Sequence, residues 1–262
     1  MPTIWIIYKQ EDTKARDILP QIHDLLEQNK YHAHTFCIDE LPILENYSRL
    51  ILLALGGDGT ILSLVNHNRK ARFPIISINT GTLGFLTTFS LDSWYDSLIP
   101  RLREYHIEDV PLLHIISGLY SDIALNEVSI TRSGIARNIS IQVDIDTEHL
   151  YTFAGDGILV ATQYGSSAYS RSVGGSLIHP AIQAFIISPI VPLSPSLPAL
   201  VIPSTAKVSL SVLEGDAIIT CDGQRVVPLS SPILIEQAPY TMPFISSIKN
   251  TYYSHIQKKK II

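Results

Sequence analysis

Short apolar runs alternate with helical periodicity over the first hundred residues, and this alternation constrains the fold more than any other feature. The runs predict strands covered on both faces, at residues 3–8, 34–38, 50–55 and 73–78. Apolar residues recur at helical spacing from Ala15 to Leu26, with Pro20 inside the pattern, so we expect that helix to be kinked or to start late. Further helices are predicted at 60–66 and 94–102. A β-α-β-α order of this kind predicts a parallel sheet.

The rhythm changes after residue 111 to period-two segments separated by Gly, Pro, Asp and Ser, which is typical of an antiparallel sandwich. Strands are predicted at 112–119, 123–131, 139–146, 157–162, 207–213, 217–221 and 233–237. Within this part only 167–173 predicts a helix. We therefore predict an α/β domain over residues 1–108 and an all-β, sandwich-like domain over 109–239. Residues 240–262 are expected to return to the first domain.

Composition excludes several classes of protein. Hydrophobic residues make up 46% of the chain and charged residues 16%, so a large core can be buried and disorder is disfavoured. The net charge of -5 gives no electrostatic footprint for nucleic acid or for an acidic membrane. The two cysteines, Cys37 and Cys221, lie far apart and form no CxxC motif, so we expect no disulfide framework and a reducing, cytoplasmic location.

Residues 172–206 contain no Asp, Glu, Lys or Arg. Six prolines break this stretch into pieces far shorter than the roughly 20 apolar residues of a spanning helix, so we predict no membrane span. We predict that part of the stretch lies at a subunit interface, where the centre of a contact is depleted in charge. The alternative is a hydrophobic segment folded into the monomer.

A glycine-rich turn, Gly-Gly-Asp-Gly-Thr at 56–60, joins a predicted strand to a predicted helix. Glycines let the backbone approach a ligand closely, and a helix N-terminus offers unpaired N–H groups to phosphate. A carboxylate beside polyphosphate is repelled unless a metal bridges the two or the acid takes a proton, and phosphoryl transfer to a hydroxyl explains either role for Asp58. The alternative is a tight turn with Asp58 as a helix cap.

Four segments in order resemble the NAD kinase family, which uses ATP to phosphorylate the 2'-hydroxyl of the adenosine ribose of NAD. They are GGDGT at 56–60, NTGTLGFL at 79–86, LNEV at 125–128 and the glycine-rich segment 155–180. The resemblance implies an ATP-dependent phosphotransferase that uses Mg²⁺ or another divalent cation. It implies that the domain at 1–108 binds nucleotide and that the domain at 109–239 binds dinucleotide. It also implies a homodimer or homotetramer with active sites near subunit interfaces.

The resemblance also assigns roles to individual residues. Asp58 is the candidate base or metal-organising carboxylate, with Gly57 and Gly59 binding nucleotide beside it. Asn126 and Glu127 are implied to bind the acceptor ribose hydroxyls, which both can reach only if the strand ends or bulges there. Without the other motifs, this pair is equally explained as a buried structural Asn and a surface Glu.

The remaining implied residues concern the adenine and the neighbouring subunit. Phe85 would pack against an adenine, although a plain core Phe explains it equally well. The family's adenine-pocket segment corresponds to Ser167, Ala168 and Tyr169. Asp156 resembles the residue that contacts dinucleotide from a neighbouring subunit, and a hairpin-turn Asp is the alternative.

The sequence departs from the family pattern at Gln163 and Tyr164, which stand where Pro and Thr are usual. This change puts the shape of the adenine pocket in question. Two rival functions stay open at this stage. A lipid kinase would share only the GGDGT motif, whereas a non-catalytic dinucleotide sensor would not require Asp58.

Overall fold

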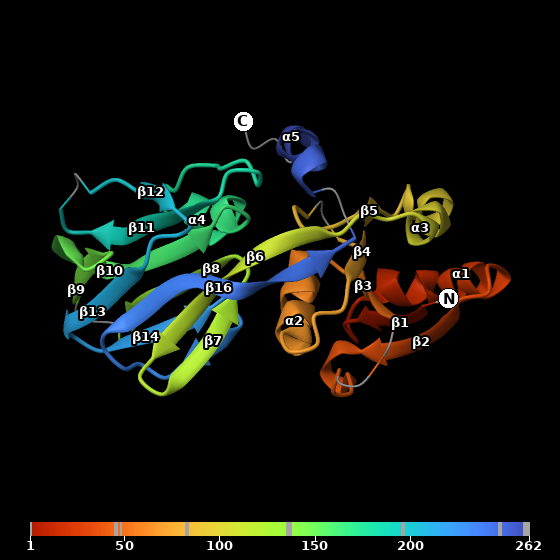
Figure 1. Cartoon of the computed structure of the whole chain (residues 1–262), viewed down its shortest axis with the longest axis horizontal. Helices are drawn as coiled ribbons and strands as arrows, with labels where there is room; N and C mark the ends of the chain where they lie inside the picture. The colour runs from red at the N-terminus through yellow and green to blue at the C-terminus, as the bar shows by residue number, and fades with distance from the viewer. Residues whose placement is uncertain are drawn as a thin grey trace. The chain divides into compact units, whose positions relative to one another are not determined.

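The computed structural model describes residues 2–44, 47, 49–81, 84–134, 138–194, 197–245 and 248–258. The chain forms two compact units (Figure 1), of which unit 1 comprises Met1–Val110 with Thr241–Ile262 and unit 2 comprises Pro111–Tyr240. The C-terminal segment therefore belongs to the same unit as the N-terminus. No helix within the described part of the chain is long and apolar enough to cross a membrane.

Unit 1 is an α/β unit built on a parallel sheet with the strand order β2-β1-β3-β4, as expected from the sequence. Its strands are β1 (Thr3–Tyr8), β2 (His32–Cys37), β3 (Leu50–Leu55), β4 (Ile75–Asn79) and β5 (Phe89–Ser90). Its helices are α1 (Thr13–Gln28), the 3-10 helix η1 (Ile38–Glu40), α2 (Asp58–Asn68), α3 (Trp94–Arg103) and α5 (Ile248–Lys258).

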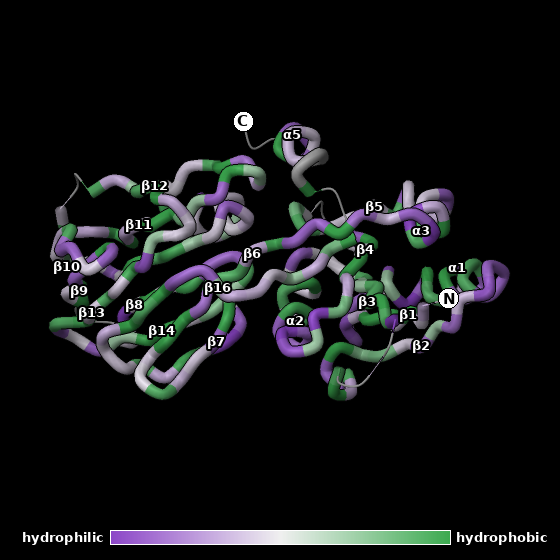
Figure 2. Tube along the Cα trace, in the orientation of Figure 1, coloured by the Kyte–Doolittle hydropathy of each residue, from purple (hydrophilic) through white to green (hydrophobic). Residues whose placement is uncertain are grey.

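The sheet of unit 1 is covered by helices because its inner strands, β1, β3 and β4, are apolar on both faces. All six residues of β3 are buried, and the strand is coloured as hydrophobic in Figure 2. Alternate residues such as Ile51 and Leu53 share a core cluster with Ile22 and Leu26 of α1. In the sheet, β2 lies on one side of β1, whereas β4 lies on the opposite side of β3, so the crossovers through α1 and through α2 run in opposite directions. Because both crossovers are right-handed, α1 and α2 cover opposite faces of the sheet. The strand order therefore reverses between β1 and β3.

Of the two expectations for Pro20, the late start of α1 is wrong, whereas a kink stays a prediction. The helix begins at Thr13, is capped by the Asp12 side chain, and continues through Pro20. A proline inside a helix leaves the carbonyl four residues earlier without its usual donor. Here that residue is Arg16, and because both Arg16 and Pro20 are exposed, water can hydrogen-bond to this carbonyl.

Unit 2 is β-rich and largely antiparallel, as expected. Its path of paired strands runs β15-β14-β8-β10-β9-β13-β16. β11 is attached to β10 and β12 to β11, while β6 is attached to β16 and β7 to β6. The strands are β6 (Glu108–Ser117), β7 (Tyr120–Ala124), β8 (Glu127–Arg132), β9 (Ile139–Ile145), β10 (Glu148–Thr162), β11 (Ala184–Pro192), β12 (Leu200–Pro203), β13 (Val208–Glu214), β14 (Ala217–Cys221), β15 (Arg225–Val227) and β16 (Ile233–Phe244). The 3-10 helix η2 (Gly165–Ser167) and α4 (Tyr169–Ser172) follow β10.

Several elements of unit 2 differ from the sequence prediction, among them β15, which was not predicted, and β10, which begins at Glu148 and not at Gly157. The run predicted as one strand at 123–131 is two strands, β7 and β8, with a bend at Leu125 and Asn126. The uncharged stretch 172–206 contains the unpredicted strands β11 and β12. Residues 184–190 of β11 are buried within unit 2, so the monomer itself accounts for that part of the uncharged stretch.

Candidate active site

In unit 1 the loops that follow β1, β3 and β4 lie at the carboxyl edge of the parallel sheet. The strand order reverses between β1 and β3, and ligands of open α/β sheets bind outside the carboxyl ends at such a reversal. Two of these loops are tied together, because the Thr80 hydroxyl donates to the carboxylate of Asp12, the cap of α1. The turn Gly56–Gly57–Asp58 follows β3 at this edge and leads into α2.

The glycines of this turn divide into two kinds. Gly56 has a φ of 153°, and a Cβ there would lie 2.1 Å from Thr60 Oγ1, so the protein itself requires glycine. A Cβ on Gly57 or on Gly59 would meet no atom of the described residues within 4 Å. The described structure therefore gives no steric reason for glycine at these two positions, which stand at the N-terminus of α2, where backbone N–H groups attract anions.

Asp58 joins the two motifs of unit 1. The backbone N–H of Phe85 donates to Asp58 Oδ2 at 2.9 Å, and that of Leu86 donates to Oδ1 at 3.0 Å. A Cβ on Gly84 would lie 2.3 Å from Asp58 Oδ1, so glycine at 84 allows the carboxylate to reach these donors. Each carboxylate oxygen keeps further lone-pair capacity. Thr82 and Leu83 of the NTGTLGFL motif lie outside the described residues.

Phe85 is buried, and its ring packs against the C-terminal helix of the same unit. Its centroid lies 6.0 Å from the ring of Tyr252 and 6.0 Å from that of His255, both on α5. This packing is what a core phenylalanine would show. A contact of Phe85 with adenine stays a prediction.

In unit 2, Asn126 lies at the bend before β8, and Glu127 is the first residue of that strand. The strand thus begins where the two adjacent polar residues stand, which is the geometry needed for both to face one ligand. Both side chains are only 6% exposed. Asn126 Oδ1 and Glu127 Oε2 have no hydrogen-bond partner among the described residues. Buried oxygens of this kind are costly unless a ligand or water satisfies them.

A third carboxyl group, Asp222, holds this bend and was not anticipated from the sequence. Its carboxylate accepts the backbone N–H groups of Leu125, Asn126 and Glu127 at 2.9, 2.8 and 3.2 Å. Burial raises the pKa of Asp222, opposed by these three donors and by the Arg225 charge. Burial and the neighbouring Asp222 charge raise the pKa of Glu127 to about 8, while the Tyr169 N–H opposes that rise.

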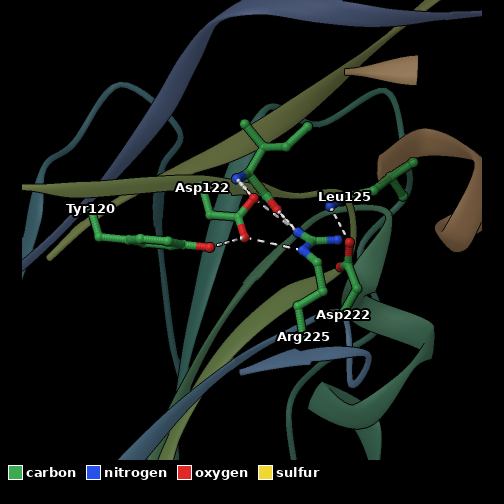
Figure 3. Close-up of polar contacts among 6 residues, drawn as sticks. Tyr120, Asp122, Leu125, Asp222 and Arg225 are labelled. Atoms are coloured by element: carbon green, nitrogen blue, oxygen red, sulfur yellow. Dashed lines mark hydrogen bonds and ion pairs between the residues drawn. The ribbon is translucent and has the colours of Figure 1, made fainter. Parts of the chain in front are cut away.

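Arg225 connects Asp222 with a second buried acid. Its guanidinium binds both oxygens of Asp122 at 3.1 and 3.2 Å and also donates to the Ile123 carbonyl. Figure 3 shows the guanidinium between the carboxylates of Asp122 and Asp222. In a sequence, an Asp-Gly pair such as Asp222-Gly223 predicts only a turn. The role of Asp222 could not be predicted, because the residues that it and Arg225 bind lie about a hundred residues earlier in the chain.

Two further predicted residues, Asp156 and Tyr169, line one shallow hollow of unit 2, about 440 Å³ in volume. Arg132, which sequence reasoning missed, donates from Nε to Asp156 Oδ1 at 2.7 Å and lines the same hollow. The glycines that flank Asp156 allow close strand approach, since a Cβ on Gly157 would lie 2.2 Å from the Ile130 carbonyl oxygen. The wall of the hollow therefore contains the ion pair between Arg132 and Asp156.

The segment after β10 forms a compact turn. Ser167 and Ala168 are partly exposed and directly precede Tyr169, whose backbone N–H hydrogen-bonds to Glu127. Tyr164 and Gln163, the two departures from the family pattern, are 4% and 2% exposed. Their side chains are thus buried within unit 2.

The residues present fit a metal that arrives with a nucleotide better than one held by the protein alone. Among the described residues there is no group of three or more His, Cys, Asp or Glu side chains that could hold an ion. Mg²⁺ is usually bound by one or two carboxylates together with substrate phosphates and waters. Asp58 is the carboxylate that could contribute to such a site from the turn Gly56–Gly57–Asp58, called the phosphate turn below.

Comparison with protein families gives two matches in chain order. Residues 6–104 match the model of the ATP-NAD kinase N-terminal domain, and residues 125–247 match that of the ATP-NAD kinase C-terminal domain. The chain is 33% identical over 278 residues to the NAD kinase of Clostridium perfringens, covering 99% of this chain and 98% of the relative. It is 32% identical over 260 residues to that of Carboxydothermus hydrogenoformans, covering 94% and 91%.

Two solved structures are similar to the whole chain. An NAD kinase from Archaeoglobus fulgidus, in complex with ATP, superposes with a TM-score of 0.86 at 26% identity and covers 98% of this chain and 99% of its own. Yeast NADH kinase, complexed with NADH, has a TM-score of 0.81 at 20% identity and covers 98% and 86%, a likeness of fold alone.

Proposed function

The chain belongs to the NAD kinase family, and from that premise we propose that it transfers the γ-phosphoryl group of ATP to the 2'-hydroxyl of the adenosine ribose of NAD, giving NADP. It is an enzyme, a kinase. The observation that best supports this chemistry in the chain's own residues is the placement of Asp58. It lies at the N-terminus of α2, and two backbone N–H groups of the second motif fix its carboxylate.

The donor nucleotide binds through its phosphates at this turn. No atom of the described residues occupies the Cβ positions of Gly57 and Gly59, so phosphate oxygens can approach the backbone there. The N–H groups at the start of α2 stabilise the negative charge. A divalent cation such as Mg²⁺ supplies charge neutralisation on the phosphates when ATP is bound. Asp58 acts either as the base for the 2'-hydroxyl or as the carboxylate that organises this metal.

The dinucleotide binds through residues of unit 2. The unsatisfied oxygens of Asn126 and Glu127 meet the ribose hydroxyls, which supply the missing hydrogen bonds. Ser167, Ala168 and Tyr169 line the adenine pocket, since they lie beside Glu127 in the fold. In unit 1, Phe85 contacts an adenine through the part of its ring that Tyr252 and His255 leave uncovered.

We further propose a homodimer or homotetramer in which Asp156 contacts the dinucleotide of a neighbouring subunit. Asp156 lies in the wall of a hollow open to solvent, as a residue serving another subunit must. Val191 and Leu193, at the end of β11, are 67% and 69% exposed, and an interface there would cover them. A cytoplasmic location stays a prediction, based on two free cysteines.

Incubation of the purified protein with ATP, Mg²⁺ and NAD tests the activity, and the expected product is NADP. Parallel reactions with NADH, with polyphosphate in place of ATP, and with diacylglycerol define the substrates. Tight NAD binding without any NADP would indicate a dinucleotide sensor. Phosphorylation of the lipid alone would indicate a lipid kinase, and either result would overturn the proposed function.

A further inference from the structure

Two buried carboxyl groups of unit 2, Asp222 and Glu127, share one stretch of backbone. The Glu127 N–H donates to Asp222 Oδ1 at 3.2 Å, and the Asp222 N–H donates to the Glu127 carbonyl at 2.9 Å. Both residues are 6% exposed. Burial disfavours the charged form of both groups, and the Asp222 charge raises the pKa of Glu127 further, so the pair is expected to keep a proton at neutral pH.

The surroundings decide which of the two keeps the negative charge. Asp222 accepts three backbone N–H groups and lies beside the Arg225 guanidinium. Glu127 accepts one backbone N–H, from Tyr169, and its Oε2 has no hydrogen-bond partner among the described residues. Hydrogen bonds to a carboxylate favour its charged form, so the charge rests on Asp222 and the proton on Glu127.

Among the described residues of unit 2, no other group that packs around Glu127 reverses this assignment. From β7, Asp122 already forms a bidentate pair with Arg225. From β14, Cys221 is buried, and its pKa is raised to about 12, so it stays neutral. β10 opposes β8 with residues 157–161, whose side chains do not titrate. From α4, Glu127 receives the Tyr169 N–H, and the Tyr169 side chain itself is 40% exposed.

We propose that Glu127 meets the dinucleotide as a neutral carboxyl group that donates a hydrogen bond, and that Asp222 is the positioning residue that keeps it in this form. The inference rests on the proposed function. A carboxylate can only accept hydrogen bonds, whereas a protonated carboxyl group donates one and accepts others. The neutral form also avoids repulsion between Glu127 and the negatively charged pyrophosphate of NAD.

The test is NAD binding in the absence of ATP, measured by calorimetry across a pH series. Because only the protonated enzyme binds well, the wild-type Kd is expected to rise about tenfold for each pH unit above about 8. Glu127→Gln keeps a neutral donor, so its Kd is expected to be independent of pH and far below that of Glu127→Ala. Glu148→Gln, which changes an exposed carboxyl group in the same unit, is the matched control and should follow the wild type.

The Asp222→Asn variant tests whether the Asp222 charge sets the pH at which NAD binding is lost, because the loss of a merely structural residue would not move that pH. Removal of the charge beside Glu127 lowers the pKa of Glu127, so the alkaline loss of binding moves to lower pH. Since this variant loses acceptors for three N–H groups and can fail to fold, infrared spectroscopy of the wild type supplies a second measurement. The C=O stretching band of a protonated carboxyl group should be present at neutral pH, disappear as pH rises through about 8, and be absent in Glu127→Gln.

The outcomes separate the inference from the proposed function. A flat wild-type pH profile with normal NADP production overturns the inference and leaves the kinase intact. A Glu127→Gln variant as weak as Glu127→Ala, or the absence of the infrared band, also overturns it. If the wild type binds no NAD at any pH, the proposed function fails and the donor role of Glu127 fails with it. The infrared band then reports only the protonation of the pair.

Discussion

Substitution of Gly84 by alanine tests whether the contact between Gly84 and Asp58 holds the phosphate turn together. The new Cβ would lie 2.3 Å from Asp58 Oδ1, and the carboxylate must retreat by roughly 1 Å to reach ordinary van der Waals contact. Such a shift breaks the two bonds from Phe85 and Leu86. Hydrogen bonds to a charged group contribute about 1.5–3 kcal/mol each. Since Asp58 is only partly buried and water can replace part of the loss, we expect a destabilisation of about 3 kcal/mol.

Denaturant unfolding of a double-mutant cycle is the assay. If the cost arises from the collision with Asp58, then Gly84→Ala should cost far less in an Asp58→Ala background, and the cycle should show a coupling of about 2 kcal/mol. Gly59→Ala is the stability control, because its Cβ meets no protein atom within 4 Å and alanine favours the helix. Additive costs of the two substitutions would refute the argument, as would a Gly84→Ala variant as stable as the wild type.

Three further predictions concern other residues. Gly59→Ala should raise the free energy of unfolding by about 0.5–1 kcal/mol yet lower kcat/KM, which kinetics and denaturant unfolding measure together; full activity would show that no ligand needs the open space. Glu127 should lower the wild-type free energy of unfolding by at most about 5 kcal/mol as pH rises from 4.5 to about 8, because Glu127 ionises in the unfolded chain before it ionises in the folded protein. Denaturant unfolding at pH 4.5 and at pH 8 measures this fall, and Glu127→Gln should abolish it. Tyr164→Thr, which introduces the usual family residue, should destabilise the protein by about 3 kcal/mol because it empties a buried aromatic site, and an unchanged melting temperature would contradict this.

The parallel sheet of unit 1 was predictable because its inner strands, β1, β3 and β4, are buried on both faces. A strand of that kind leaves an unbroken apolar run in the sequence, as Leu50–Leu55 does, and its boundaries follow from where the run stops. The turn that follows was readable for a related reason, since glycine and Asp between such a run and a helix are local signals.

Strand β11 escaped prediction because two prolines interrupt it. Pro189 and Pro192 nevertheless lie opposite Ile158 and Gly155 of β10. The neighbour on the other side, β12, pairs only with residues 184–187. After residue 187, the edge of β11 that faced β12 is unpaired, and a proline, which has no N–H to donate, is tolerated on such an edge. The sequence carries no sign of this partial pairing, so the prolines indicate loop.

The network around Glu127 was unpredictable for a different reason, which is sequence distance. Asn126 and Glu127 could be named from a motif, but the state of Glu127 depends on Asp222 and Arg225, about a hundred residues further along the chain. Burial and a neighbouring charge fix the protonation of an acid, and neither can be read from the residues beside it.

Asp58 and Asp222 use their carboxylates in the same way, and this affects how mutations at both should be interpreted. Each accepts backbone N–H groups from a distant motif: Asp58 from Phe85 and Leu86, and Asp222 from residues 125–127. Substitution of either by Asn places an amide donor against a backbone donor, so lost activity mixes displaced backbone with lost charge. For Asp58 the Gly84→Ala variant separates the two effects, because it keeps the carboxylate and moves it. If Gly84→Ala loses as much kcat as Asp58→Asn while both bind NAD, the position of the acid, and not only its charge, is required for phosphoryl transfer.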